Sequence, residues 1–184
     1  AEIEERSLRE IYLVPFEMAV KEAGTWAIMS SYNKINGTYA AENHWLLTQV
    51  LRVEWGYDGI IMSDWFGSRT TAPTLNAGLN LEMPGPARDR GDKLVDAVQA
   101  GDVSAQTVRS LALDMLRLMQ RTGSLDDHRS HKERAEDRPE HRALIRRAGA
   151  EGSVLLKNSG LLPLGKSAGQ YIAVIGPNAK VAQI

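Results

Sequence analysis

Short runs rich in apolar residues alternate along the first two thirds of the chain with segments whose apolar residues recur every three or four positions. The short runs, typical of strands buried on both faces of a parallel sheet, are Trp26–Ser31, Gly59–Met62 and Leu79–Met83. The periodic segments, which predict helices, are Glu4–Ala23, Glu42–Glu54, Thr71–Ala77, Asp92–Ala100 and Ser104–Gln120. Strands that alternate with helices indicate right-handed βαβ units and a parallel α/β sheet.

Proline, glycine and capping residues set the predicted ends of these elements. Pro15 has no backbone N–H to donate, so the helix predicted over Glu4–Ala23 must kink there or begin anew. Ser104 is placed to cap the helix that follows it, and Gly123 stands where a helix end favours a residue that tolerates positive φ. Asn36-Gly37-Thr38 matches the acceptor pattern for N-glycosylation, but Asn-Gly is also a strong turn former, and we predict a turn there.

The composition changes abruptly after residue 123. Residues 124–138 are dense in charge and poor in apolar side chains, which predicts an interdomain linker. His128 and His131 lie in this linker without the further ligands and apolar support of a metal site, so we interpret them as solvated. A helix is predicted to open at Pro139, and the later segments VLLKN, LLPL and YIAVIG predict the start of a second α/β domain over 139–184.

Charge and composition narrow the class of partner. The 22 basic and 23 acidic side chains give a net charge of -1, which provides no electrostatic footprint for nucleic acid or an anionic membrane. No stretch of about eighteen apolar residues is present, and without cysteine there is neither a disulfide framework nor a thiolate zinc site. We therefore expect a neutral small-molecule partner and no cofactor or metal ion, whereas compartment and oligomeric state stay open.

Both ends of the sequence favour an internal fragment of a longer protein. The N-terminus, AEIEERSLREIYL, has neither an initiator Met nor the plan of a signal peptide. The C-terminus stops just after the run YIAVIGPNA, where a unit of this type would normally continue.

Asp64 is the candidate chemical residue, because the strand predicted over Gly59–Met62 runs directly into Ser63-Asp64-Trp65. In α/β barrels the chemistry lies where strands end at their carboxyl side, which makes an acid there a catalytic candidate. An Asp after a strand is also a common N-cap of the next helix or an Asx-turn residue. Taken alone, the tripeptide leaves both interpretations open.

Six blocks of the sequence, in this order and spacing, resemble glycoside hydrolase family 3 and in particular its β-glucosidases. The blocks are LREIYLVPFEMAVKEAG, IMSSYNKINGTYAAEN, LLTQVLRVEWGYDGIIMSDWFG, LNAGLNLEMPGP, AEGSVLLKNSGLLPL and IAVIGPNA. The resemblance covers nearly the whole chain, with the linker as the main stretch outside it.

The resemblance implies a fold and a set of site residues. Residues 1–123 would be the last three strands of a (β/α)8 TIM-like barrel, and 139–184 the start of an α/β sandwich domain that supplies an acid/base glutamate beyond Ile184. Asp64 matches the nucleophile of the family. Tyr32 and Trp65 match residues that line the subsite for the non-reducing sugar, and Met29 lies near the same rim.

Glu82 is the most tempting second carboxylate of the chain. Retaining cleavage needs two carboxyl groups about 5 to 5.5 Å apart, and Glu82 lies at the end of the next predicted strand. Because the family draws its acid/base residue from the second domain, we predict instead that Glu82 holds neighbouring donors. Glu17, Glu42 and Glu54 are predicted to lie on solvated helix faces.

The resemblance implies a retaining β-glucosidase that cleaves terminal β-D-glucosyl residues of a small glucoside or oligosaccharide through an ester on Asp64. A β-xylosidase or an enzyme of mixed specificity stays open. So does a non-catalytic carbohydrate-binding protein on the same fold, because fold alone does not prove activity. A β-N-acetylglucosaminidase relative is disfavoured by the linker and the second-domain start.

Overall fold

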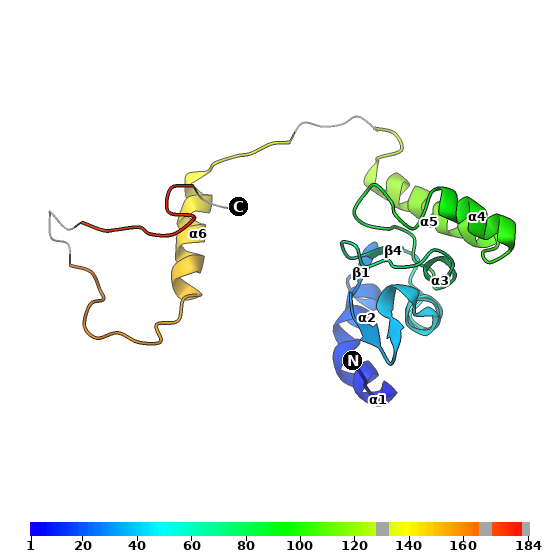
Figure 1. Cartoon of the computed structure of the whole chain (residues 1–184), viewed down its shortest axis with the longest axis horizontal. Coiled ribbons are helices and arrows are strands. Elements are labelled where there is room, and N and C mark those ends of the chain that lie inside the picture. The colour runs from blue at the N-terminus through cyan, green and yellow to red at the C-terminus, as the bar shows by residue number, and fades with distance from the viewer. Residues whose placement is uncertain (128–132, 166–170, 182–184) are drawn as a thin grey trace. The chain divides into compact units, whose positions relative to one another are not determined.

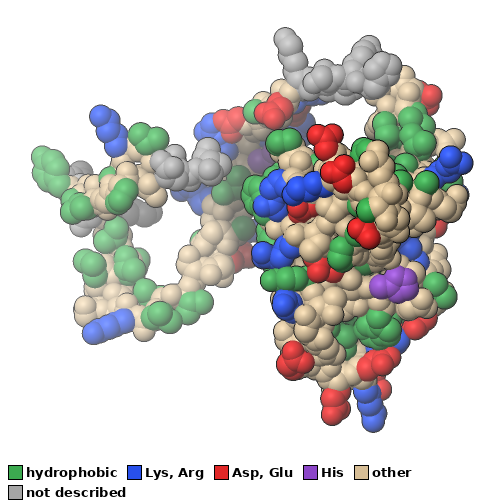
Figure 2. Space-filling view, turned by 45° about the vertical axis from the view of Figure 1, so that its right-hand side comes forward, with side chains coloured by type: hydrophobic (Ala, Val, Ile, Leu, Met, Phe, Trp, Pro, Cys, Tyr) green, Lys and Arg blue, Asp and Glu red, His purple; other side chains and the backbone are tan. Residues whose placement is uncertain are grey.

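The computed structural model describes residues 1–127, 133–165 and 171–181. The chain divides into two compact units, Ala1–Ser130 and His131–Ile184, which are treated separately below (Figure 1). His128 and His131 lie outside the described residues. On the face drawn in Figure 2, acidic and basic side chains are interspersed, in keeping with the near-neutral net charge. Within the described ranges, no helix is long and apolar enough to cross a membrane.

The first predicted helix is divided into three pieces. They are α1 (Glu5–Ser7), the wide-turn π-helix η1 (Leu8–Tyr12) and α2 (Val14–Lys21). Pro15 occupies the first turn of α2, where a missing N–H costs no intrahelical hydrogen bond. Of the two alternatives for Pro15, the chain therefore begins a new helix.

Strands β1 (Ala27–Ser30) and β4 (Ile60–Ser63) pair in parallel, as the alternation of strands and helices predicted. Their register runs from Ala27 opposite Ile60 to Ser30 opposite Ser63, so the two carboxyl ends are level. The strand predicted over Leu79–Met83 is reduced to a single parallel bridge between Leu81 and Met62. The described strands do not close into a barrel.

Side chains replace backbone groups beside β4, which explains why the third strand is so short. The Ile61 N–H donates to Oδ1 of Asn80 at 2.8 Å, and the Met83 N–H donates to Oγ of Ser63 at 2.9 Å. Only the middle of the segment makes ladder bonds, such as Ser63 N to Leu81 O at 2.9 Å. A regular ladder needs backbone partners along its length, and here they are present only around Leu81.

The turn at Asn36-Gly37 forms as predicted. It joins β2 (Lys34–Ile35) to β3 (Thr38–Tyr39) in an antiparallel hairpin. Asn36 has φ 49° and Gly37 has φ 85°, the left-handed pair that a type I′ hairpin turn requires. The Asn36 side chain also bonds both the N–H and the C=O of Ile3, which ties the hairpin to the N-terminal segment.

The remaining helices of the first unit follow the predicted order with shifted ends. They are the 3₁₀ turn η2 (Ala40–Glu42), the π-helix η3 (Trp45–Glu54), α3 (Ala72–Asn76), α4 (Asp92–Ala100) and α5 (Ala105–Thr122). Ser104 caps α5 as predicted, since its hydroxyl accepts the Thr107 N–H at 2.9 Å. Gly123 ends the same helix at φ 76°, also as predicted.

Two of the three apolar clusters among the described residues fix β4 and the helices near it. One packs Leu47 and Leu51 of η3 against Ile61 of β4. The other joins Leu75 of α3 to Leu111 of α5, together with residues of α4. Burial of such side chains stabilises the fold by about 1.5–3 kcal/mol each. The core thus lies between β4 and the helices around it.

The second unit contains the helix α6 (Pro139–Glu151), which begins at Pro139 as predicted and buries no side chain. The strand predicted from Tyr171 is absent, because no described residue pairs with that segment. Its apolar side chains stay exposed, with Ile175 at 90%. A strand requires hydrogen-bonding neighbours, and within 133–165 and 171–181 it has none.

Candidate active site

The carboxyl ends of β1 and β4 bring the candidate residues to one edge of the sheet. Ser30 and Ser63 are in register, and the Asp64 N–H continues the pairing by donating to Ser30 O at 3.3 Å. Met29 and Tyr32 therefore flank the end of β1, while Asp64 and Trp65 follow β4 directly. These are the four residues that the sequence singled out, and pairing alone places them together.

Asp64 is half-buried and forms a tight turn. Its Oδ1 accepts the N–H of Trp65 at 2.7 Å, and its backbone C=O accepts the N–H of Gly67 at 2.9 Å. The next helix, α3, begins at Ala72 with Thr71 at its N-cap position. Asp64 therefore does not cap α3, and the interpretation of Asp64 as a helix cap is wrong.

Tyr32 follows the end of β1 and lies close enough to Asp64 for the carboxylate to influence its phenol. The pKa of Tyr32 is raised above its ordinary value, first by loss of solvation and then by the hydrogen bond and the negative charge of Asp64. These effects all favour the neutral phenol, so Tyr32 keeps a proton that it can donate to the carboxylate. The arrangement gives Asp64 a donor from the neighbouring strand end.

Large side chains stand exposed around Asp64. Met29 is 42% exposed, Tyr32 48% and Trp65 46%. Phe66, which no sequence pattern singles out, is 53% exposed and has φ 61°. Its N–H donates to Met83 O at 2.9 Å, so the turn after Asp64 is joined to the neighbouring segment. No periodic signal marks Phe66; only its place in the Asp-Trp-Phe-Gly turn could have indicated it.

Glu82 has the structural role that was predicted for it. The residue is buried, and its Oε1 accepts the backbone N–H of Arg88 at 2.9 Å. The N–H of Asp89 donates to Oε2 at 3.1 Å. Both carboxylate oxygens thus hold the loop that follows Met83.

Of the three helix glutamates predicted to be solvated, Glu42 is not. It is half-buried in the short turn η2, and its Oε1 accepts the Thr70 hydroxyl at 2.9 Å. Glu17 pairs with Lys21 on the exposed face of α2. Glu54 pairs with Arg9, whose hydrogen bond is the main reason that the pKa of Glu54 is lowered.

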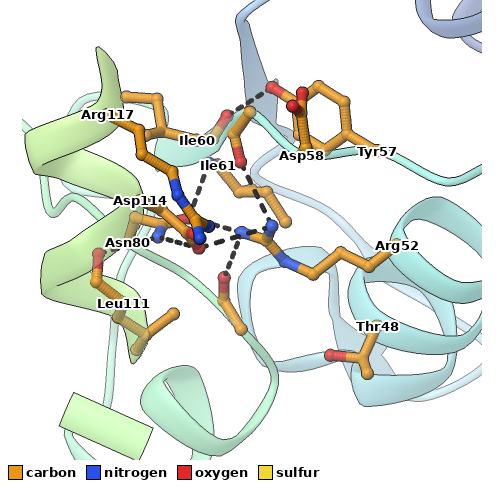
Figure 3. A network of polar contacts seen from close by, with 12 residues as sticks. Thr48, Arg52, Tyr57, Asp58, Ile60, Ile61, Asn80, Leu111, Asp114 and Arg117 are labelled. Atoms are coloured by element: carbon orange, nitrogen blue, oxygen red, sulfur yellow. Dashed lines mark hydrogen bonds and ion pairs between the residues drawn. The ribbon is translucent and has the colours of Figure 1, made fainter. Parts of the chain in front are cut away.

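A polar network holds the opposite end of β4 (Figure 3). Oδ1 of Asn80 accepts both the Ile61 N–H at 2.8 Å and Nη2 of Arg52 at 2.7 Å. Nδ2 of Asn80 donates to Oδ2 of Asp114 at 3.1 Å, and Arg52 lies 3.5 Å from the same oxygen. Burial lowers the pKa of Arg52, while the charge of Asp114 opposes that effect. Sequence reasoning missed this network because its members lie on separate elements.

The comparisons with known proteins agree on one family. Residues 1–118 match the family described as "Glycosyl hydrolase family 3 N terminal domain". A β-glucosidase of Rhizobium radiobacter is 62% identical over 184 residues, which are 100% of this chain and 22% of the relative.

Two solved structures extend the likeness to the fold. The β-glucosidase of Bifidobacterium adolescentis is 44% identical, with a TM-score of 0.68 over 89% of this chain and 24% of that one. β-Glucosidase 3B of Thermotoga neapolitana, solved in complex with glucose, is 38% identical, with a TM-score of 0.70 over the same shares. The chain spans about a fifth of the length of the curated relatives that it matches. Because the family match covers more than half of its residues, the chain belongs to glycosyl hydrolase family 3.

Proposed function

We propose that this chain is the nucleophile-bearing part of a retaining β-glucosidase, which releases terminal β-D-glucosyl residues from a small glucoside or oligosaccharide. One observation carries the proposal. Asp64 stands at the shared carboxyl edge of β1 and β4, with its carboxylate bonded to the Trp65 N–H and with the phenol of Tyr32 nearby. The names of the relatives reported above, all β-glucosidases, support the substrate class.

The proposed reaction has two displacements at the anomeric carbon. A carboxylate oxygen of Asp64 forms a bond to that carbon while the bond to the leaving oxygen breaks, and an acid group protonates the leaving oxygen. Water then attacks the same carbon, the ester bond breaks, and the acid group, now a base, takes the proton of the water. The carboxylate of Asp64 is regenerated, and no cofactor is needed.

The neighbours of Asp64 have separate tasks in this proposal. The Trp65 N–H fixes Oδ1, so the carboxylate keeps one orientation toward the sugar. The neutral phenol of Tyr32 stabilises the anionic form of Asp64 between displacements. The exposed ring of Trp65 and the side chain of Met29 offer apolar surface to the C–H face of a pyranose.

The acid/base residue is proposed to come from elsewhere in the longer protein. Both oxygens of Glu82 already accept backbone N–H groups. Glu42 accepts a hydrogen bond from Thr70, and Glu54 is paired with Arg9. We therefore propose that a glutamate of a following domain protonates the leaving oxygen, and we expect the 184-residue chain alone to be inactive.

The proposed architecture is the last part of a (β/α)8 barrel over 1–123, a linker over 124–138 and the start of an α/β sandwich over 139–184. Among the described residues β1 pairs on one side only. A mostly apolar groove of about 510 Å³ runs along it between η1 and η3. An open strand edge beside apolar surface supports the presence of further strands on that side.

The alternative functions have weaker support. A β-xylosidase, an enzyme of mixed specificity and a non-catalytic carbohydrate-binding protein were all compatible with the sequence. The relatives and solved structures reported above are named as β-glucosidases, and none of those names supports an alternative.

A covalent label tests the proposal. A chimaera would carry these 184 residues in place of the matching stretch of the Rhizobium radiobacter β-glucosidase, which aligns over the whole chain. Incubation with a slow fluorinated glucoside, followed by peptide mapping, is expected to find the glycosyl label on Asp64. A label on another carboxylate, or hydrolysis of an aryl glucoside by the isolated chain at a rate sensitive to Asp64→Ala, would contradict it.

A further inference from the structure

A second hollow of about 370 Å³ lies immediately after the Asp64 turn, and we call it the cationic pocket. Its lining residues are Phe66, Ser68, Arg69, Arg88, Asp89 and Lys93. Three of these six side chains are cationic and one is acidic. Nothing in the proposed reaction at Asp64 uses them.

The cations of the pocket are only partly neutralised. Lys93 pairs with Asp89 at 3.2 Å, and the nearest carboxylate oxygen to Arg88 is the buried Oε1 of Glu82 at 3.8 Å. Arg69 lies over the ring of Tyr39 at 4.7 Å, and no ion pair between described residues includes it. An excess of positive charge around a small hollow favours an anionic ligand.

The pocket also contains one aromatic ring, that of Phe66. The Arg88 guanidinium lies 4.8 Å from the centre of the Phe66 ring, and Nη2 of Arg88 donates to Ser68 O at 3.1 Å. Phe66 is held by its N–H bond to Met83 O and remains 53% exposed. The ring and guanidinium together form a platform on which a planar or pyranose ring can stack.

The pocket is within reach of a group leaving the proposed nucleophile. Phe66 is two residues from Asp64, and two residues span at most about 7 Å. If a sugar is bound at Asp64, a ring attached to its anomeric oxygen extends over a similar distance. The platform and the cations therefore lie close enough to Asp64 to reach a leaving group.

We propose that the cationic pocket is a subsite for the leaving group and that it favours aglycones carrying a carboxylate on a ring. The ring stacks on Phe66 and Arg88, and the carboxylate meets the charges of Arg69 and Lys93. Guanidinium matches the two oxygens of a carboxylate, whereas an amide of the same shape gains no ionic attraction. This inference rests on the proposed function, because it takes Asp64 to be the point of cleavage.

The matched pair of substrates is para-carboxyphenyl and para-carbamoylphenyl β-D-glucoside, hydrolysed by the chimaera. Arg69→Gln and Lys93→Gln are each expected to lower the carboxylate-to-amide ratio of kcat/KM by about fivefold, and the double variant by more. High salt should lower the same ratio. The control is Lys21→Gln, which also removes one cation of an i,i+4 pair but lies on α2. It should leave the ratio unchanged.

A carboxylate on a ring can belong to a phenolic acid or to a uronic acid, and a second pair of substrates distinguishes these two classes. Glucosyl-glucuronate and its neutral glucosyl-glucose counterpart replace the aryl glucosides in otherwise identical assays. If Lys93→Gln lowers the charged-to-neutral ratio of kcat/KM for the aryl pair alone, the pocket is assigned to phenolic acids. Sensitivity for the disaccharide pair assigns it to uronic acids, and insensitivity in both pairs overturns the proposal.

A binding experiment on the 184-residue chain keeps this test separate from the proposed function. Saturation-transfer NMR compares para-hydroxybenzoate with para-hydroxybenzamide. Transfer to the benzoate that is lost in the Arg69→Gln/Lys93→Gln double variant supports the subsite, whatever the activity of the chimaera. Equal transfer to both compounds, or no loss in the variant, overturns the subsite. Inactivity of the chimaera toward both glucosides contradicts only the proposed function.

Discussion

The two ends of β4 are built on opposite plans. At the entry, which is the amino end of β4, Gly59, Ile60 and Ile61 are buried. The Arg52–Asn80–Asp114 network bonds both this end of the strand and the loop that contains Asn80. At the exit, which is the carboxyl end of β4, Asp64 to Phe66 carry half-buried or exposed side chains, and their N–H groups bond Ser30 O, Oδ1 of Asp64 and Met83 O. One four-residue strand thus separates the part that holds the fold from the part that presents functional groups.

The difference predicts which measurement responds to a change at each end. Substitutions at the entry should act on the free energy of unfolding, because they uncover buried polar groups or crowd the core. Substitutions at the exit should act on turnover, because their side chains contribute little packing. All four tryptophans lie between residues 26 and 65, so tryptophan fluorescence reports unfolding of the first unit alone.

The largest effect is expected for Asp64→Asn at the exit. The amide cannot form the glycosyl ester, so kcat of the chimaera should fall by about 10⁴-fold or more. Unfolding of the isolated chain in urea should shift by less than about 0.5 kcal/mol. A large loss of stability with retained turnover would reverse the assignment of the two ends.

Asp114→Ala tests the entry. It removes the carboxylate that bonds Asn80 and pairs with Arg52 and Arg117, leaving the mostly buried Arg52 without that charge. The free energy of unfolding should fall by about 3 kcal/mol. The exposed pair of Glu17 with Lys21 supplies the control, because Glu17→Ala should cost at most about 0.5 kcal/mol. Equal effects of the two substitutions would show that the network stabilises the fold no more than an exposed ion pair does.

Gly59→Ala tests the tight packing at the same end. A Cβ at this position would lie 2.5 Å from both Trp26 O and the Tyr57 hydroxyl oxygen. The strand must shift, at a cost of about 2 kcal/mol measured by tryptophan fluorescence in urea. Gly149→Ala adds the same methyl group to α6 in open space and should leave that transition in place. An unaltered midpoint for Gly59→Ala would refute the close approach.

Tyr32→Phe sharpens the comparison at the exit. Loss of the phenol hydroxyl removes a proton donor close to the Asp64 carboxylate, which should lower kcat of the chimaera about tenfold. Because the pKa of Tyr32 is raised, the donor persists as pH rises and is lost only above about pH 10. Tyr12→Phe, on η1, is the control for loss of a hydroxyl. A change in KM with kcat intact would instead place Tyr32 in sugar binding alone.

The smallest effect concerns the Arg121–Asp58 pair beside the entry. The hydrogen bond from Arg121 is the main cause that lowers the pKa of Asp58. The stabilising contribution is therefore present above about pH 4 and is lost as pH falls through the lowered pKa. The stability difference between wild type and Asp58→Asn should shrink in acid. The control is Asp96→Asn, which also replaces an exposed carboxylate by an amide but lies on α4.

Sequence patterns predicted those parts of the fold that depend on neighbours in the chain. Helix α5 with its Ser104 cap, the Asn36-Gly37 turn and the parallel pairing of β1 with β4 are of this kind. Parallel pairing in turn brings Met29, Tyr32, Asp64 and Trp65 to one edge. The prediction of their shared location followed from strand order and family resemblance, whereas their catalytic and binding roles remain proposals.

The parts that sequence could not predict depend on side chains from distant segments. Asn80 takes a backbone position beside Ile61, so the strand expected over 79–83 shrinks to one bridge. Thr70 binds Glu42 across 28 positions, which removes Glu42 from the solvated class. The strand expected from Tyr171 lacks partners among the described residues. In each case the outcome depends on whether a partner distant in the sequence is present, and the local pattern of apolar residues carries no information about such a partner.

Phe66 gives the exit of β4 a thermodynamic liability. A bulky residue at φ 61° is strained by about 1–3 kcal/mol, and glycine would hold the same turn without that strain. Selection for thermal tolerance alone would therefore remove the ring, and laboratory evolution for heat resistance offers a way to watch that happen. The strained dihedral angle of Phe66 thus exchanges some stability of the turn for an exposed aromatic ring beside Asp64.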